Sequence, residues 1–214
     1  MGSMKLSRLH LCFVLVVAWL IGTGTAFWSL EGQYFRPAHR PAGAAESRPD
    51  LRPPVPIASL PTDQGRIRLA GPGPVTLLNF WNPNCPCSRF SEVHTAQLAR
   101  TFGPRGVRCV TVIECAGSPR DGLSAWKSRG LSGFAAAADP GGETARTFGV
   151  WAAPAAVVLD REGRVCYVGA YNSARYCDDS HSAWAQQALE AVLAGRRPPR
   201  AKTLFFGCQV IAQR

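Results

Sequence analysis

The chain has 214 residues, 46% of them hydrophobic, which is long enough for one membrane segment and one domain with a packed core. Its formal net charge of +10 comes mainly from arginine. The basic residues are scattered along the chain and form no stripe interleaved with aromatic residues, so the composition argues against nucleic-acid binding. Eight cysteines are many for a cytosolic chain of this length, and they favour an oxidising compartment or a thiol enzyme.

The first segment in chain order is almost wholly apolar from Leu9 to Phe27, which is long enough to cross a bilayer as a helix. Lys5 and Arg8 precede it, and this order keeps the N-terminus in the cytoplasm and sends the rest of the chain across. We therefore expect an uncleaved signal anchor over residues 1–28. A small-residue cleavage site at 24–26 is the alternative.

Residues 29–56 are expected to form a tether, because the stretch is rich in proline, alanine and arginine and has no apolar period. The folded domain is expected over residues 57–214, where strands and helices alternate. The expected elements are a short strand at 66–70, a buried strand at 75–80, a helix at 88–102, a buried strand at 107–113, a helix at 123–129, a short strand at 134–138, a short helix at 143–148, a hairpin of strands at 155–159 and 164–168, and a helix at 182–193.

Two cysteines separated by one proline follow the buried strand 75–80 and open the helix. Thiols at such a junction lie at the positive end of a helix dipole, which favours the thiolate and makes sulfur nucleophilic. Proline fixes its own φ and pushes the preceding residue towards an extended conformation. Cys85 is therefore expected just outside the helix as the exposed nucleophile, Pro86 at the first helical position and Cys87 in the first turn. A disulfide across a single residue is possible but tight.

The chain resembles the membrane-anchored, envelope-facing thioredoxins of the TlpA/ResA kind in its element order and in two motifs. The first motif is Leu78-Asn79-Phe80-Trp81, directly before the cysteines, and the second is Val150-Trp151-Ala152-Ala153-Pro154, directly before a buried strand. The relatives normally show Cys-x-Pro-Cys, so one residue is missing here. The resemblance implies an α/β fold, a thioredoxin-like three-layer sandwich with a central mixed sheet, preceded by a transmembrane helix. It also implies that Pro154 is the cis-proline of that fold.

The function that the resemblance implies is an envelope thiol–disulfide oxidoreductase of the bacterial inner membrane. The protein would be single-pass, with its domain facing the periplasm, and its partners would be protein thiols or disulfides. Cys85 would attack a substrate disulfide and Cys87 would resolve the mixed disulfide. No cofactor is expected. The substrate-binding residues implied are Trp81, Pro86, Ala153 and Pro154.

Asn79 stands where cytosolic thioredoxins carry a buried aspartate, so proton transfer needs another group. Glu92 and His94, in the expected helix at 88–102, are the candidates, and a solvated helix face is the plainer interpretation of both.

Two other functions compete with disulfide exchange. Cys85, Cys87 and His94 could hold soft Cu(I) in a copper chaperone on the same scaffold. The chain has two methionines, both near the N-terminus, and so lacks the methionine enrichment that would strengthen this hypothesis. A thiol peroxidase that reacts through Cys85 ranks lower.

The pairing of the remaining cysteines is left open by the sequence. Cys177 and Cys208 flank the last helix, so a disulfide between them would pin the C-terminal tail. Alternatively, this late region brings extra cysteines to the active site. Cys115 and Cys166 have no assigned partner.

Overall fold

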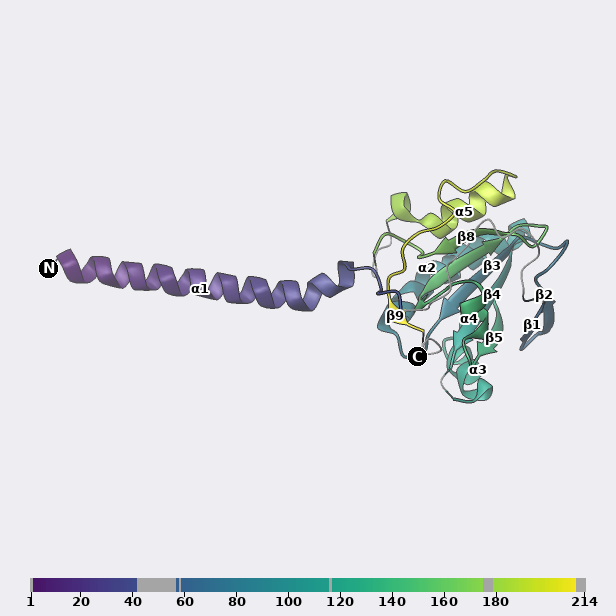
Figure 1. Cartoon of the computed structure of the whole chain (residues 1–214), viewed down its shortest axis with the longest axis horizontal. Helices are drawn as coiled ribbons and strands as arrows, with labels where there is room; N and C mark the ends of the chain where they lie inside the picture. The colour runs from purple at the N-terminus through teal and green to yellow at the C-terminus, as the bar shows by residue number, and fades with distance from the viewer. Residues whose placement is uncertain (1, 42–56, 58, 116, 175–178, 211–214) are drawn as a thin grey trace. The chain divides into compact units, whose positions relative to one another are not determined.

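The computed structural model describes residues 2–41, 57, 59–115, 117–174 and 179–210 (Figure 1). The chain divides into two compact units, Met1–Arg36 and Pro37–Arg214. The first unit contains one helix, α1 (Gly2–Phe35), so the expected N-terminal helix is confirmed and continues through residues 29–35. Within α1, the stretch Arg8–Leu30 has a mean hydropathy of 2.0 and is long and apolar enough to span a membrane.

The second unit is an α/β domain. Its elements, in chain order, are β1 (Ser59–Thr62), β2 (Gly65–Arg68), β3 (Thr76–Trp81), α2 (Pro86–Phe102), η1 (Gly103–Arg105), β4 (Arg108–Glu114), α3 (Pro119–Lys127), β5 (Ala135–Asp139), α4 (Glu143–Thr147), β6 (Ala152–Ala153), β7 (Ala155–Leu159), β8 (Val165–Gly169), η2 (Ser180–Ser182), α5 (Trp184–Leu193) and β9 (Cys208–Gln209). Every helix and strand expected in this unit is present, within a few residues of the expected bounds.

A five-stranded mixed sheet with the order β5-β4-β3-β7-β8 forms the centre of the domain. β3 pairs in parallel with β4 and antiparallel with β7, and β4 pairs in parallel with β5. β7 and β8 form the expected antiparallel hairpin. The central strand β3 is buried at every position, which explains why its sequence is a continuous apolar run interrupted only by Asn79.

Alternate side chains of β3 point into two separate cores. Leu77 and Trp81 pack with residues of α2, α3 and α5 on one face of the sheet. Leu78 and Phe80 pack on the other face with residues of α4, the β1–β2 hairpin and the C-terminal segment. The period of two along the strand thus produces three layers, and the predicted thioredoxin-like sandwich is confirmed.

The sequence analysis missed the path of the chain after α5. Thr203 N donates to Val168 O at 3.1 Å and Ala170 N donates to Leu204 O at 3.3 Å, so this segment runs along the edge of β8. It then forms β9, which pairs antiparallel with β6. The N-terminal end of the domain joins the same region, because Ala38 N donates to Phe205 O at 2.7 Å. The rest of the expected tether, 42–56, lies outside the described residues.

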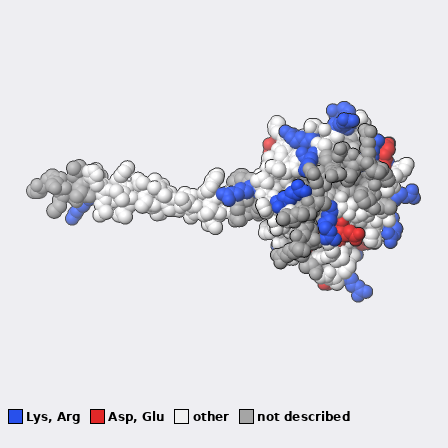
Figure 2. Space-filling view, in the orientation of Figure 1, with Lys and Arg blue, Asp and Glu red and all other residues white. Residues whose placement is uncertain are grey.

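Charged side chains are dispersed over the described part of the domain surface in Figure 2. Blue lysine and arginine side chains stand apart from one another on this face and form no continuous stripe.

Leu78 tests the central role of β3 in stability. Its side chain is 0% exposed, so Leu78→Ala removes buried methyl groups and leaves a cavity, and we expect a loss of about 2–5 kcal/mol of unfolding free energy. Denaturant unfolding of the full chain in detergent micelles, followed by tryptophan fluorescence, measures this. Val93 on α2 is 75% exposed, and the control Val93→Ala should stay within about 0.5 kcal/mol of the wild type. Equal losses in the two variants would contradict the assignment of the core.

Candidate functional site

The cysteine motif has the local geometry that its sequence predicts. Cys85 is the N-cap of α2, with φ −95° and ψ 116° in the extended region, and Pro86 stands at the start of the helix. Cys87 follows in the first turn. Pro86 is exposed, whereas both cysteine side chains are buried. The N-terminus of α2, with its outward-facing N–H groups, therefore lies directly at the two sulfurs.

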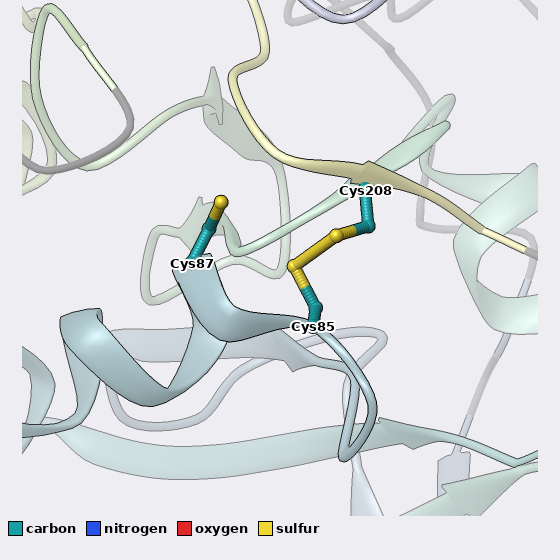
Figure 3. Close-up of side chains that lie close together, drawn as sticks. All are labelled: Cys85, Cys87 and Cys208. Carbon is teal, nitrogen blue, oxygen red and sulfur yellow. A yellow bond between two sulfur atoms is a disulfide. The ribbon is translucent and has the colours of Figure 1, made fainter. Parts of the chain in front are cut away.

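A disulfide joins Cys85 to Cys208 of β9, 123 residues further along the chain (Figure 3). The two Cα atoms are 5.9 Å apart. Figure 3 shows Cys87 beside this bond, with its sulfur on the same side of α2. The three sulfur atoms lie within 4.8 Å of one another. Thiol–disulfide exchange within the cluster therefore requires only small movements of side chains.

One expectation about these cysteines is wrong. Cys85 is 0% exposed and Cys87 2% exposed, so Cys85 is not an exposed nucleophile in this structure, because β9 covers it. Cys208 bonds to Cys85 instead of pinning the tail to Cys177, which lies outside the described residues. The alternative that the late region brings an extra cysteine to the Cys-Pro-Cys motif is confirmed for Cys208.

A cis-proline lies against the cysteine cluster, as the resemblance implies. The peptide bond between Ala153 and Pro154 is cis. The carbonyl oxygen of Ala153 is 3.4 Å from the Sγ atom of Cys85. Ala153 also pairs directly with Cys208 in the β6–β9 ladder. The backbone next to the proline thus contacts both ends of the disulfide-bonded pair.

Buried polar groups fix the loop that leads from β3 to Cys85. Asn82 donates from Nδ2 to the Glu114 carboxylate at 2.7 Å. The Oδ1 atom of Asn82 accepts from the backbone N–H of Asn84 at 2.7 Å. The backbone N–H of Asn82 donates to Ser88 Oγ at 3.2 Å. Since Asn82 and Glu114 are both buried, these bonds hold the loop in one conformation and orient the first turn of α2.

Glu92 and Trp81 form a second buried polar cluster behind α2. Trp81 Nε1 donates to Glu92 Oε1 at 3.1 Å. The Arg129 guanidinium binds both carboxylate oxygens of Glu92 at 2.8–3.1 Å. Glu92 is therefore neither on a solvated helix face nor open to a substrate. The hydrogen bond and the charge of Glu92 raise the pKa of the Arg129 guanidinium. Trp81 packs edge-on to Trp126 in the core, with 5.2 Å between ring centroids.

His94 lies on α2 beside Tyr171, whose ring centroid is 5.8 Å from that of His94. Tyr171 donates to Asn79 Oδ1 at 2.8 Å, and burial raises the pKa of its phenol. His94 and Tyr171 line a cavity of about 520 Å³ together with Pro154 and Phe206. His94 and the cis-proline Pro154 therefore line the same cavity. The imidazole of His94 does not belong to the cluster formed by the sulfurs of Cys85, Cys87 and Cys208.

The sulfur cluster has the chemistry of a soft-metal site when it is reduced. Three cysteine sulfurs within 4.8 Å suit Cu(I), which prefers thiolate ligands. Among the described residues the third sulfur beside Cys85 and Cys87 is that of Cys208. The expected set of Cys85, Cys87 and His94 stays a prediction.

The other described thiols of the domain have environments that suppress reactivity. Burial raises the pKa of Cys109 to about 12. Burial, followed by the charge of Asp160, raises the pKa of Cys166 to about 11. Burial also raises the pKa of Cys115. Neutral thiols are poor nucleophiles, so these three cysteines are less reactive than an unperturbed thiol.

The sequence analysis assigned no role to Arg129, Asn82 or Glu114, and it named Cys208 only as one alternative. Cys208 carried a weak signal, since it follows Phe206 and Gly207 in a cysteine-containing tail beyond the last expected helix. Arg129 carried none, because its carboxylate partner lies 37 residues earlier in the chain.

Comparison with known proteins supports the fold. Residues 56–210 match the family described as "Domain of unknown function (DUF6436)". No curated protein matches the chain in sequence. A similar solved structure is an uncharacterized conserved protein from Geobacillus kaustophilus, with 21% identity, a TM-score of 0.62, and coverage of 75% of this chain and 93% of that one.

Two further structures are similar. A hypothetical protein from Sinorhizobium meliloti has 24% identity and a TM-score of 0.60, covering 71% of this chain and 88% of its own. The exposed lipoprotein thioredoxin of Streptococcus pneumoniae has 23% identity and a TM-score of 0.51, covering 62% and 96%. At these identities the similarity establishes the thioredoxin-like fold and no more.

Cys166, in β8 outside the cluster, provides a pH test of how burial suppresses thiol reactivity in this domain. Its thiol has a pKa of about 11 in the folded protein against 9.0 for the unperturbed group, because burial favours the neutral form. At pH 8 the folded protein should therefore hold roughly a hundredth of the thiolate of an unperturbed cysteine at this position, and alkylation should slow in proportion. Labelling followed by mass spectrometry should show Cys166 reacting faster as the pH rises towards 11. The denatured chain is the control, and equal rates in both states at pH 8 would contradict the prediction.

Proposed function

The chain belongs to the family described as "Domain of unknown function (DUF6436)", and we propose that it is a thiol–disulfide oxidoreductase that exchanges disulfides with protein thiols through Cys85 and Cys87. The observation that carries the proposal is the cluster of three sulfurs within 4.8 Å at the start of a helix and beside a cis-proline. Cys85 and Cys208 form a disulfide, and the thiol of Cys87 lies next to it.

The N-terminus of α2 stabilises the thiolates that the exchange reaction needs. Each exchange step needs one sulfur to attack as a thiolate and another to leave as a thiolate. The positive end of the helix dipole lies at Cys85 and Cys87 and stabilises the anion in both roles. Cys85 is the central sulfur of the cluster because it bonds to Cys208 across the cis-proline and is one residue from Cys87. Cys87 is the resolving thiol.

The four proposed substrate-binding residues divide by exposure. Pro86 is exposed beside the cysteines and can contact a partner directly. Ala153 and Pro154 offer backbone next to Cys85, although in this structure that backbone pairs with β9. Trp81 is in the core and bound to Glu92, so its role is to position the end of β3 rather than to touch a substrate.

The two candidates for proton transfer also divide. Both oxygens of Glu92 are bound by Arg129 and one also by Trp81, so this carboxylate serves to position α2. His94 lines the cavity that reaches Pro154, and we assign proton transfer to its imidazole.

We place the protein in a bacterial inner membrane as a single-pass protein with its domain in the periplasm. The support is the apolar stretch Arg8–Leu30, which has Lys5 before it and begins with Arg8, together with the oxidising chemistry that the cysteine cluster requires. Its partners there would be envelope proteins with exposed thiols or disulfides.

A second function is favoured by the same three sulfurs. In the reduced state Cys85, Cys87 and Cys208 form a thiolate set for Cu(I), which would make the domain a copper-binding chaperone. This function needs the cluster reduced, whereas disulfide exchange needs it to alternate between the two states.

The exchange activity is tested with the full chain in detergent micelles and a synthetic peptide that carries two cysteines. Oxidised protein should convert the peptide dithiol to a disulfide, and Cys85→Ser should abolish the reaction because the central sulfur is lost. Cys166→Ser is the matched control and should retain the wild-type rate, since Cys166 in β8 is outside the cluster. Absence of exchange in the wild type, with stoichiometric Cu(I) binding that Cys85→Ser removes, would support the copper function instead.

The membrane topology is tested separately by adding protease to intact spheroplasts. The domain should be digested, because Lys5 and Arg8, which precede the apolar stretch that starts at Leu9, hold the N-terminus in the cytoplasm. A cytoplasmic protein serves as the control for spheroplast integrity. Protection of the domain until the cells are lysed would contradict the periplasmic location.

A further inference from the structure

The segment from Phe205 to Val210 fills the backbone position beside the cis-proline. β9 pairs with β6 in antiparallel register, with Cys208 opposite Ala153 and Gln209 opposite Ala152. Cys208 then reaches Cys85 and bonds to it. The chain's own tail thus lies where a cysteine-containing strand from another protein would have to lie to exchange with Cys85 directly.

The tail is anchored on both sides of Cys208. Phe205 is buried and packs against Trp151, with 4.3 Å between ring centroids. Val210 is buried too, and its N–H donates to Trp151 O at 2.9 Å. Burial of both flanking side chains and their backbone bonds makes the tail a part of the domain core.

Gly207 allows the tail to approach the proline this closely. Its φ is +143°, in the region that favours glycine. A Cβ atom at this position would lie 2.0 Å from Ala153 O and 3.0 Å from Pro154 Cδ. Any other residue would therefore push Cys208 away from Cys85.

Exposure within the cluster is unequal. Cys85 and Cys87 are buried beneath the tail, while Cys208 is half-buried, with the exposed Gln209 next to it. A thiol on another protein therefore meets Cys208 before either cysteine of the Cys-Pro-Cys motif.

On the proposed exchange function, we propose that Cys208 is a third redox cysteine, which passes electrons between protein thiols outside and the buried Cys85. A substrate thiolate attacks Cys208 Sγ, the Cys85–Cys208 bond breaks, and Cys85 leaves as a thiolate and takes up a proton. The second substrate thiolate then attacks the substrate sulfur of the mixed disulfide and releases Cys208, which is also protonated. The substrate dithiol loses two electrons and two protons and becomes a disulfide, and the protein gains two thiols.

Cys87 connects this relay to the motif. Its thiolate can attack Cys85 Sγ in the Cys85–Cys208 bond, which forms Cys85–Cys87 and releases Cys208 as a thiolate with no net oxidation. In the reducing direction the cluster starts with all three thiols: the Cys208 thiolate attacks a substrate disulfide and releases one substrate thiol, and the Cys85 thiolate then attacks Cys208 Sγ, which re-forms Cys85–Cys208 and releases the second substrate thiol.

The location of the mixed disulfide tests the relay. Oxidised full-length protein in micelles is mixed with a peptide carrying one cysteine, quenched with acid, digested and analysed by mass spectrometry. We expect the peptide on Cys208. A peptide bound to Cys85, with Cys208 released as a thiol, would overturn the proposal.

The exchange rate of Cys208→Ser gives a second test. Access to the buried Cys85–Cys87 pair then depends on opening of the tail, so exchange with the two-cysteine peptide should slow by about tenfold or more. If Cys208→Ser exchanges as fast as the wild type or faster, Cys208 only blocks the site and the relay is wrong. Failure of the proposed function is distinct, because the wild type would then not exchange at all.

Gly207→Ala separates docking of the tail from the presence of the thiol. The variant keeps Cys208 but should displace it, so the mixed disulfide should move from Cys208 to Cys85. Gly103→Ala is the matched control, because a Cβ there meets nothing within 4 Å, and it should leave the mixed disulfide on Cys208. Circular dichroism checks that each variant folds. If Gly207→Ala does not fold, the exchange rate of Cys208→Ser tests the proposal. An unchanged mixed disulfide in folded Gly207→Ala would contradict the role of this close approach.

Discussion

The antiparallel pairing of β6 with β9 is the contact on which the architecture of the site depends. β6 has two residues and carries the carbonyl next to the cis-proline, and β9 has two residues and begins with Cys208. Their register sets Cys208 opposite Ala153, and so brings a sulfur from the end of the chain to the start of α2. Without this pairing the domain would hold two neighbouring cysteines under an open edge of backbone.

Two buried carboxylates make the other half of the site rigid. Glu114 holds Asn82 and so the loop before Cys85, while Glu92 ties α2 to Trp81 at the end of β3 and to Arg129. A carboxylate that is buried must be hydrogen-bonded or paired to offset its loss of hydration. These polar groups therefore stabilise one orientation of the N-terminus of α2 relative to the sheet. That orientation fixes the positions of the Cys85 and Cys87 sulfurs.

Local sequence predicts most of the fold because the signals are local. The apolar run of β3, the proline at the start of α2 and the turn between β7 and β8 each specify their own element. The Cys-Pro-Cys motif likewise specifies its own backbone. Cys208 is different, since β9 is too short to show a period and its partner strand lies more than 50 residues earlier. Arg129, the partner of Glu92, could not be found from local sequence either, because it lies 37 residues further along the chain. The expectation that Glu92 lies on a solvated helix face was wrong, because its carboxylate is buried.

The third cysteine also resolves the geometric problem of the shortened motif. A disulfide across one proline is tight, whereas Cys85 and Cys208, with Cα atoms 5.9 Å apart, have the spacing that an ordinary disulfide prefers. The cluster can therefore store a disulfide outside the motif and keep Cys87 available for exchange. The same arrangement couples the two candidate functions, because forming Cys85–Cys208 removes two of the three thiolates that Cu(I) would need. Oxidation of the cluster would expel the metal, and a bound metal would block the disulfide, so a single set of sulfurs supports one function at a time.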